Sequence, residues 1–140
     1  MINFTKRKGK EKMLKIIIPG DPVTKKNHGR IVQKKFANGK RLPIMLPSKP
    51  YIEYEKKCKQ YIPTLRQLSL IDYPINLKCT YYMETRRKTD LTNLLQATCD
   101  ILVKYGILQD DNYSIIASFD GTRAYYDKEN PRVEIEINKL

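Results

Sequence analysis

Apolar residues recur along the chain with two different periods, and the period of two predicts β-strands. Residues 13–20, MLKIIIPG, form a short apolar run that ends at a proline and a glycine, which is typical of a strand before a turn. From Ile75 to Met83 the odd-numbered residues are apolar and most even-numbered ones are polar. This alternation predicts a strand with one buried face. Residues 113–127 and 132–139 predict two further strands joined by a polar loop.

A spacing of three and four residues predicts a first helix over residues 48–63. Ser48 is a candidate N-cap, Pro50 stands in the first turn, and the helix should end or kink near Pro63. Three tyrosines with helical spacing are able to stack on bases, but such aromatics more often belong to the core: Tyr51, Tyr54 and Tyr61.

The second predicted helix begins near Leu91 and contains the most regular apolar pattern of the chain. Thr89 or Asp90 stands where an N-cap belongs, and Gly106 stands where a helix stops. Its apolar face consists of Leu91, Leu94, Leu95, Thr98, Ile101, Leu102 and Tyr105.

Residues 21–50 separate the first strand from the first helix and are strongly basic. The Asn38-Gly39 pair between basic flanks is a hairpin turn signal. We therefore interpret the segment as a basic loop or ribbon able to lie along a phosphate backbone. A solvated surface loop is the alternative interpretation.

The order of elements is strand, basic loop, helix, strand, helix, strand, strand, which predicts an α+β (mixed α/β) domain with a single sheet and two main helices. A chain of 140 residues is long enough for one domain with its own core. Residues 1–12 are basic and show no periodicity, so we expect a disordered arm followed by one domain over 13–140.

The charge balance indicates a polyanionic partner. The chain has 27 Lys and Arg against 15 Asp and Glu, a formal net charge of +12. Such a field favours nucleic acid, and an anionic membrane surface or mere solubility are the alternatives. The three cysteines have no C-x-x-C spacing, and no apolar run is long enough to span a bilayer. We expect a cytoplasmic protein in a reducing compartment.

Acidic and basic residues cluster around the second predicted helix in a way that suits metal-dependent phosphodiester hydrolysis. Arg86, Arg87 and Lys88 precede Asp90, and the adjacent Asp110 and Asp111 follow the helix. Mg²⁺ is bound by one or two carboxylates together with waters and substrate phosphate, while basic groups hold the charged backbone. The single histidine excludes a multi-histidine zinc site, and no phosphate-binding P-loop motif occurs. Helix capping is the competing interpretation of Asp90.

These residues resemble the RusA-type Holliday junction resolvases, a family of small homodimeric Mg²⁺-dependent endonucleases common in bacteriophages and prophages. The resemblance is carried by the basic run, by the segment Asp90-Leu91-Thr92-Asn93-Leu94, and by Asp100, Gly106 and the Asp110-Asp111 pair. It extends to the segments IPGDPVTKKNHGR and SKPYIEYEKK, so it covers most of the chain from Met13 onward.

The resemblance implies a RusA-like dimeric fold and a set of site residues. Asp90 and Asp111 would be metal ligands for Mg²⁺, for which Mn²⁺ can substitute, with Asp110 as an accessory acid. The branched-DNA partner, a four-way junction, would be held by Lys25, Lys26, Arg30, Arg86, Arg87 and Lys88. The alternative from another class is a branched-DNA or RNA binding protein without catalysis.

Two positions depart from the family pattern and favour that alternative. Thr92 stands where the family commonly has a second catalytic aspartate, and Gln96 stands where it has a lysine. A threonine brings a hydroxyl but no charge, so metal affinity should fall unless another acid compensates. Asp110 is the first candidate for this role and Asp100 the second, although a structural role for Asp100 is the simpler expectation.

The length of the second helix poses a geometric problem for a site made of Asp90 and Asp111. A helix from Leu91 to about Lys104 is roughly 20 Å long, and the connection from Tyr105 to Asp110 spans at most about 20 Å. Asp111 therefore reaches Asp90 within one chain only if that connection runs almost straight back. Otherwise the site is completed lower on the helix or by a second subunit.

Overall fold

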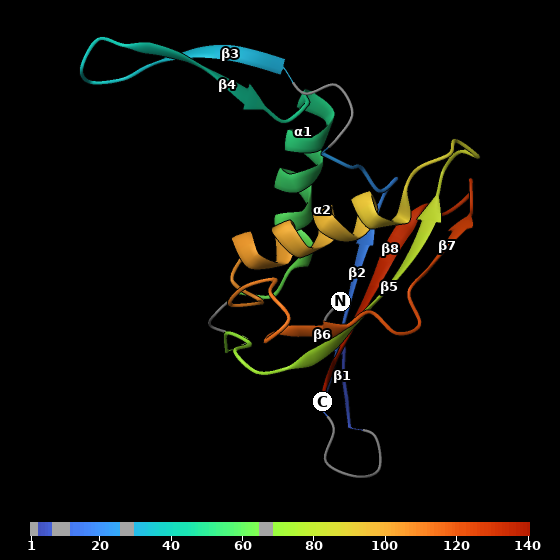
Figure 1. The fold of residues 1–140 in the computed structure, drawn as a ribbon. Helices are drawn as coiled ribbons and strands as arrows, with labels where there is room; N and C mark the ends of the chain where they lie inside the picture. Colours follow the sequence, from blue (N-terminus) through green and yellow to red (C-terminus); the bar gives the residue numbers. More distant parts are fainter. Residues whose placement is uncertain (1–2, 7–11, 26–29, 65–68) are drawn as a thin grey trace.

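One mixed sheet forms the centre of the protein in a computed structural model that describes residues 3–6, 12–25, 30–64 and 69–140 (Figure 1). The first four strands in spatial order, β1-β2-β8-β5, pair antiparallel, and β6 and β7 both pair parallel with the outer edge of β5. The strands of this sheet are β1 (Asn3–Lys6), β2 (Lys12–Pro19), β5 (Ile75–Met83), β6 (Ile116–Ser118), β7 (Arg123–Tyr126) and β8 (Arg132–Lys139).

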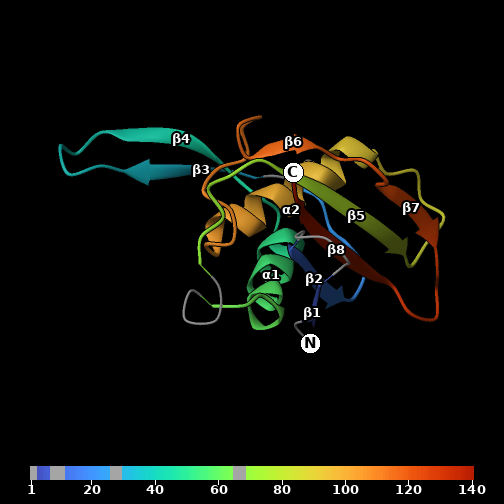
Figure 2. The ribbon, with the colours of Figure 1, turned by 90° about the horizontal axis from the view of Figure 1, so that it is seen from below.

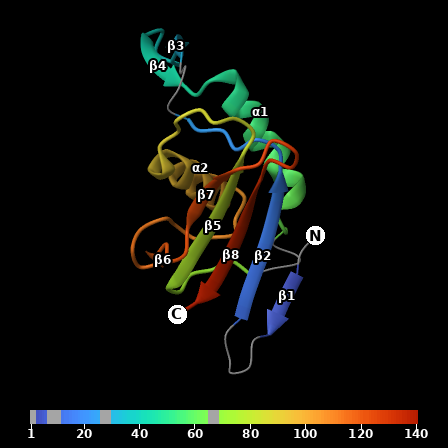
Figure 3. The ribbon, with the colours of Figure 1, turned by 90° about the vertical axis from the view of Figure 1, so that its right-hand side faces the viewer.

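The described helices lie on one face of this sheet (Figure 3). They are α1 (Lys49–Cys58), which continues into a short 3-10 turn (Lys59–Tyr61), and α2 (Leu91–Lys104). Alternate residues of β2, β5 and β8 point toward the helices and are buried, so the core lies between the two layers. α2 connects β5 to its parallel neighbours, as such pairing requires a crossover. The predicted α+β class with one main sheet is confirmed.

The two predicted helices and their end signals are also confirmed. The side chain of Ser48 accepts a hydrogen bond from the backbone N–H of Tyr51, with 3.4 Å between the atoms. Gly106 has a φ of +78°, the left-handed conformation that ends a helix. Tyr51 is buried in the core, and Tyr54 and Tyr61 pack against it, so these rings are not base-stacking surfaces.

The prediction of a single strand over residues 113–127 is wrong. The segment forms β6 and β7, which are separated by a turn in which the N–H of Thr122 bonds to the carbonyl of Phe119. Gly121 occupies this turn with a φ of +85°. The side chain of Asn76 on β5 accepts a hydrogen bond from the N–H of Asp120, at 2.8 Å. This cross-strand contact holds the turn against the sheet, which local periodicity does not reveal.

Five described residues of the predicted disordered arm belong to the sheet, namely Asn3–Lys6 in β1 and Lys12 at the start of β2. β1 pairs with β2 from Asn3 opposite Lys15 to Lys6 opposite Lys12. At its edge, β2 has backbone N–H and C=O groups that need hydrogen-bond partners, and β1 supplies them. The local sequence does not reveal this pairing. Residues 1–2 and 7–11 lie outside the described residues, and the domain boundary at residue 13 stays a prediction.

The predicted basic ribbon is present as a separate two-stranded sheet. β3 (Arg30–Lys35) and β4 (Arg41–Leu46) pair antiparallel and extend away from the rest of the molecule (Figure 2). The turn contains the predicted Asn38-Gly39 pair, and Gly39 has a φ of +80°.

The described helices do not include one that is long and apolar enough to cross a membrane. All three cysteines, Cys58, Cys79 and Cys99, are free and buried. Burial raises the pKa of the Cys58 thiol to about 11 and that of Cys79 to about 12. Because only the thiolate is strongly nucleophilic, these side chains act as core residues.

Candidate active site

Asp90 lies at the junction between the central sheet and α2. It is the N-cap of α2, and its backbone carbonyl accepts hydrogen bonds from the N–H groups of Asn93 and Leu94, at 3.1 and 3.2 Å. Its carboxylate accepts no capping bond from the helix backbone. The carboxylate is exposed, and its one hydrogen bond within the described residues comes from the Asn93 amide at 3.4 Å. Side-chain capping therefore does not account for Asp90, and both carboxylate oxygens remain accessible to a cation.

The two departures from the expected motif lie on the exposed side of α2. Thr92 and Gln96 are one turn apart and both face solvent, whereas Leu94 and Ala97 are buried against the sheet. Asn93 is half-buried and contacts Asp90. The first two turns of α2 thus place Thr92 and Gln96 at the surface near Asp90, and neither adds a charge.

The basic run reaches Asp90 from the end of β5, and its three side chains are exposed. The Arg86 guanidinium lies 4.1 Å from the centre of the Tyr126 ring on β7. Arg87 and Lys88 take part in no ion pair with any residue that the structure describes. Their charges are therefore available to phosphate groups.

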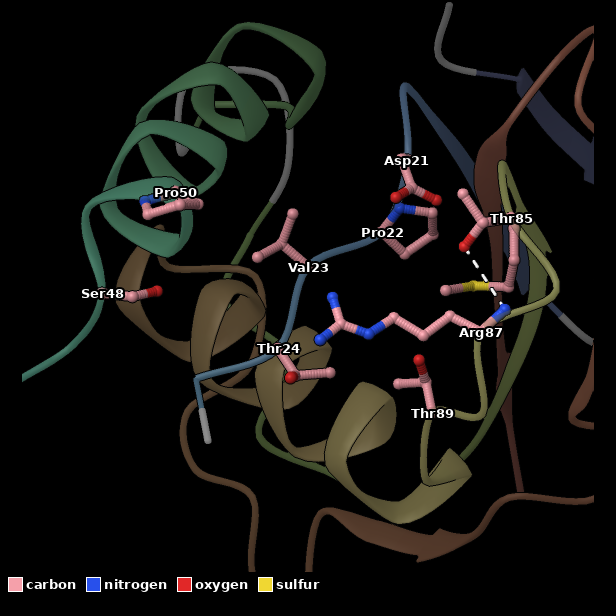
Figure 4. Close-up of a pocket in the computed structure, with 10 residues that line it drawn as sticks. Asp21, Pro22, Val23, Thr24, Ser48, Pro50, Thr85, Arg87 and Thr89 are labelled. Atoms are coloured by element: carbon pink, nitrogen blue, oxygen red, sulfur yellow. Dashed lines mark hydrogen bonds between the residues drawn. The ribbon is translucent and has the colours of Figure 1, made fainter. Parts of the chain in front are cut away.

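Arg87 extends into a pocket of about 310 Å³ between the β5–α2 connection and the β2–α1 connection (Figure 4). Its guanidinium ends near Val23 and Thr24, and the hydroxyl groups of Thr85 and Thr89 lie along its path (Figure 4). The two connections are joined where the N–H of Glu84 donates to an Asp21 carboxylate oxygen at 2.9 Å. The remaining lining residues are Pro22, Ser48, Pro50 and Met83.

Asp110 and Asp111 follow the other end of α2, and both are exposed. The Asp110 carboxylate accepts hydrogen bonds from the N–H of Asp111 and from the Asn112 amide, each at 2.8 Å. These bonds, the backbone one first, hold the pKa of Asp110 below its ordinary value. Asp110 therefore shapes the turn, whereas the Asp111 carboxylate accepts no hydrogen bond from the described part of the chain.

A wide groove between α1 and α2 is lined by Asp110 and Asp111. Asp100 shares it and forms an ion pair with Lys25, with 2.9 Å between Nζ and Oδ2. The structural role expected for Asp100 is thus supported. The Lys25 ammonium group also lies 5.4 Å from the centre of the buried Tyr51 ring. The groove is also lined by Pro47, Ile52, Glu55, Lys56, Val103, Lys104, Asp110 and Asp111.

Asp90 and Asp111 lie at opposite ends of α2, whose 14 residues correspond to a length of roughly 20 Å. The chain does not run back along the helix after Gly106. Instead, the N–H of Ile107 bonds to the Leu102 carbonyl at 2.9 Å, and the N–H of Gln109 bonds to the Ile71 carbonyl at 2.9 Å. These bonds hold the Asp110-Asp111 turn beside the C-terminal half of α2, where Asp111 lines one groove with Asp100, whereas Asp90 lies at the N-terminus of the helix.

The carboxylate chemistry fits Mg²⁺ held by one or two protein ligands. Hard oxygen donors at exposed positions leave room for the waters and substrate phosphates that Mg²⁺ retains. A closed protein cage is not what the described residues offer, because they contain no group of three or more His, Cys, Asp or Glu side chains able to hold an ion. Asp90 at one end of α2 and Asp111 at the other are the candidate ligands.

The predicted DNA-binding residues of the 21–50 segment have different outcomes. Lys25 is engaged with Asp100 and so is not a free phosphate contact in this structure. Lys26 lies outside the described residues, and Arg30 is described only as the first backbone position of β3.

The apolar pattern of the sequence did not predict that Glu55 pairs with Lys104 across the groove. Glu55 on α1 forms an ion pair with Lys104 at the end of α2, and this hydrogen bond is the main cause that raises the pKa of Lys104. The Tyr105 hydroxyl donates to the Glu55 carbonyl at 2.9 Å. The sequence contains a weak signal, since Glu55 lies on the polar side of the first helix, but its partner is 49 residues away.

An exposed carboxylate lies at the N-terminus of α2, beside cations that form no ion pair among the described residues, and a basic ribbon projects from the body of the protein. This arrangement suits contact with phosphate groups. The profile of the family described as Endodeoxyribonuclease RusA matches residues 19–138, and the chain belongs to this family. A curated relative, the crossover junction endodeoxyribonuclease RusA of Aquifex aeolicus (strain VF5), is 38% identical over 42 residues. That match covers 30% of this chain and 33% of the relative.

Proposed function

We propose that this protein is a structure-selective endodeoxyribonuclease that resolves four-way DNA junctions by Mg²⁺-dependent phosphodiester hydrolysis. The observation that carries the proposal is the Asp90 carboxylate, which is exposed at the N-terminus of α2, unused for capping and preceded by Arg87 and Lys88, which form no ion pair with a described residue. Family membership over residues 19–138 supports the reaction class. A role in recombination, repair or phage DNA processing in a bacterial cytoplasm is consistent with this activity.

Each group of the site has a distinct task in the proposed reaction. Arg87 and Lys88 hold the phosphates on either side of the scissile bond, and such contacts give affinity and shape recognition without base specificity. Asp90 and Asp111 would hold Mg²⁺, and the ion would supply positive charge to polarise the phosphate and to favour deprotonation of the attacking water. Asp110 holds the turn that positions Asp111 through its two hydrogen bonds.

The separation of Asp90 and Asp111 favours a site shared between two subunits. In a two-fold dimer with the α2 helices antiparallel, Asp90 of one chain would meet Asp111 of the partner subunit. The same symmetry produces two equivalent sites separated by about the length of α2, roughly 20 Å. Two such sites would nick opposed strands of a junction symmetrically.

A nicking assay on a four-way junction in Mg²⁺ tests the reaction. We expect cleavage by the wild type and loss of cleavage in Asp90→Asn and Asp111→Asn. Persistent junction binding without metal-dependent cleavage by the wild type would reject the enzyme and support the second candidate, a non-catalytic branched-DNA or RNA binding protein. The observation that favours this second candidate is the pair of uncharged side chains, Thr92 and Gln96, exposed beside Asp90.

A mixture of the two inactive variants tests the shared site. If the site is shared, a heterodimer of Asp90→Asn and Asp111→Asn chains has one intact site, made by Asp90 of one chain and Asp111 of the other. Co-refolded equal amounts should then recover single-strand nicking on about one quarter of the wild-type number of sites. If each site lies within one chain, the mixture stays inactive.

A further inference from the structure

The β3–β4 ribbon stands apart from the body of the protein. It is a two-stranded sheet whose paired residues run from Arg30 opposite Leu46 to Lys35 opposite Arg41, and it projects beyond α1 (Figures 1 and 2). The eight steps along the chain from Arg30 to Asn38 give it a reach of roughly 25 Å at ~3.3 Å per residue. An isolated hairpin is only marginally stable in water, so contact with a binding partner would stabilise this ribbon.

The charge of the ribbon indicates the class of that partner. Residues 22–52 contain eight Lys or Arg and no Asp or Glu. The outer half of the ribbon is the most basic, and none of its cations is ion-paired with a described acidic group. These cations are Lys34, Lys35, Lys40 and Arg41. The uncompensated charge fits a polyanion and argues against a second copy of this basic chain.

One aromatic ring lies at the centre of these cations, at the tip of the ribbon. Phe36 is 38% exposed, and the Lys34 ammonium group lies 5.6 Å from the centre of its ring. The turn is closed by hydrogen bonds from the N–H of Gly39 to the Phe36 carbonyl at 3.0 Å and from the N–H of Phe36 to the Lys40 carbonyl at 2.9 Å. The conformation of the tip is therefore fixed by its own hydrogen bonds, and Phe36 does not belong to the hydrophobic core of the protein.

We propose that the ribbon is a DNA-binding arm whose Phe36 ring stacks on an unstacked base at the branch point of a junction. Where duplex arms separate, a terminal base pair exposes a flat apolar face surrounded by phosphates. An aromatic ring surrounded by cations is complementary to such a surface, because every base offers a face for stacking and each cation contacts a phosphate. The choice of branched DNA as the partner rests on the proposed function.

Binding without metal tests this arm independently of cleavage. The probes are a four-way junction with 2-aminopurine next to the branch point and a linear duplex of equal length, both in EDTA. We expect Phe36→Ala to bind the junction about 5- to 100-fold more weakly, to bind the duplex as the wild type does, and to lose the fluorescence change. Phe36→Trp should retain all three properties of the wild type.

The cations of the arm have a matched control elsewhere on the surface. Lys35→Gln should reduce the slope of log affinity against log salt concentration for both probes by almost one unit. Lys128→Gln removes a lysine that is also exposed, in the β7–β8 connection, and should leave the slope unchanged. Equal slopes for the two variants would contradict phosphate contact by the arm.

Other outcomes overturn the stacking role or separate it from the proposed function. Equal losses on junction and duplex in Phe36→Ala would reject stacking at a branch point. A change in oligomeric state, measured by light scattering, would show that Phe36 contacts a second copy instead. Unchanged junction affinity in Phe36→Ala together with normal Mg²⁺-dependent cleavage would reject the DNA-binding arm and leave the proposed nuclease activity intact. A loss of junction affinity in Phe36→Ala, with no cleavage by the wild type, would support the arm and reject the nuclease activity.

Discussion

The two ends of α2 carry aspartates in opposite electrostatic situations. At the N-terminal end, Asp90 has no cation bound to it within the described residues, and the nearby Arg87 and Lys88 have no acidic partner. At the C-terminal end, Asp100 is paired with Lys25, and the turn of Asp110 already uses its own carboxylate. The charges at the N-terminal end are therefore available to a ligand, whereas those of Asp100 and Asp110 stabilise the fold.

Asp111 is the exception at the C-terminal end, because its carboxylate is exposed and forms no ion pair within the described residues. Its charge, together with that of Asp100, adds to the burial that raises the pKa of the Cys99 thiol to about 12. Asp111 also lines the groove between α1 and α2, together with Asp100. Within the described residues, each end of α2 has one exposed carboxylate without an ion pair, which is what the proposed site shared between two subunits requires.

The strongest test of the open end is Asp90→Asn. We expect junction cleavage to fall by roughly 10²- to 10⁴-fold, because the substitution removes the charge that binds the metal in the proposed reaction. The thermal unfolding midpoint should stay the same, since the Asp90 side chain makes no capping bond. Asp120→Asn, at an exposed position in the β6–β7 turn, is the control and should cleave normally. A large loss of stability in Asp90→Asn would instead indicate a structural carboxylate.

The next largest effect is expected from adding charge at the open end. Thr92→Asp places a second carboxylate in the first turn of α2, close to Asp90. We expect half-maximal cleavage at a roughly tenfold lower Mg²⁺ concentration, because ligand charge sets the affinity for hard cations. Thr92→Asn adds similar bulk without charge and should behave like the wild type. Equal Mg²⁺ requirements in all three proteins would exclude Thr92 from the metal site.

A smaller effect on stability is expected at the paired end. Lys25→Met removes the ion pair with Asp100, whose side chain is 27% exposed. A partly exposed pair contributes about 0.2–1 kcal/mol, so the unfolding midpoint should fall by roughly 1–4 °C. A double-mutant cycle with Asp100→Asn measures the coupling. A coupling free energy of zero would contradict a stabilising ion pair. A loss of Mg²⁺-dependent cleavage without loss of stability would show that Lys25 serves the active site and not the stability of the fold.

The smallest effect concerns the pH dependence of the Asp110 turn. Because hydrogen bonds from Asp111 and Asn112 hold the pKa of Asp110 below its ordinary value, the ionised form stabilises the folded state above that ordinary value. This stabilisation is lost as the pH falls through the lowered pKa. The unfolding midpoints of wild type and Asp110→Asn should therefore differ slightly at neutral pH and converge in acid. A gap that widens on acidification would contradict this role.

Local patterns predicted the elements in which short-range physics dominates. The alternation along β5, the apolar face of α2, the Ser48 cap and the Asn38-Gly39 turn all depend on neighbours within a few residues. The prediction over 113–127 was wrong because Asn76, more than 40 residues away, holds the Asp120 turn. β1 was missed because an edge strand obtains its stability from pairing with β2.

The amino-acid sequence by itself determined the class of the domain, the identity of the candidate acidic and basic residues, and the resemblance that family membership later confirmed. Only the tertiary structure decided how these residues are used. Lys25 became the partner of Asp100, and the hydrogen bonds of Ile107 and Gln109 placed the turn of Asp111 beside the C-terminal half of α2. The physical reason is that a charge interacts with whatever the packed chain places beside it, and sequence spacing does not encode that neighbour.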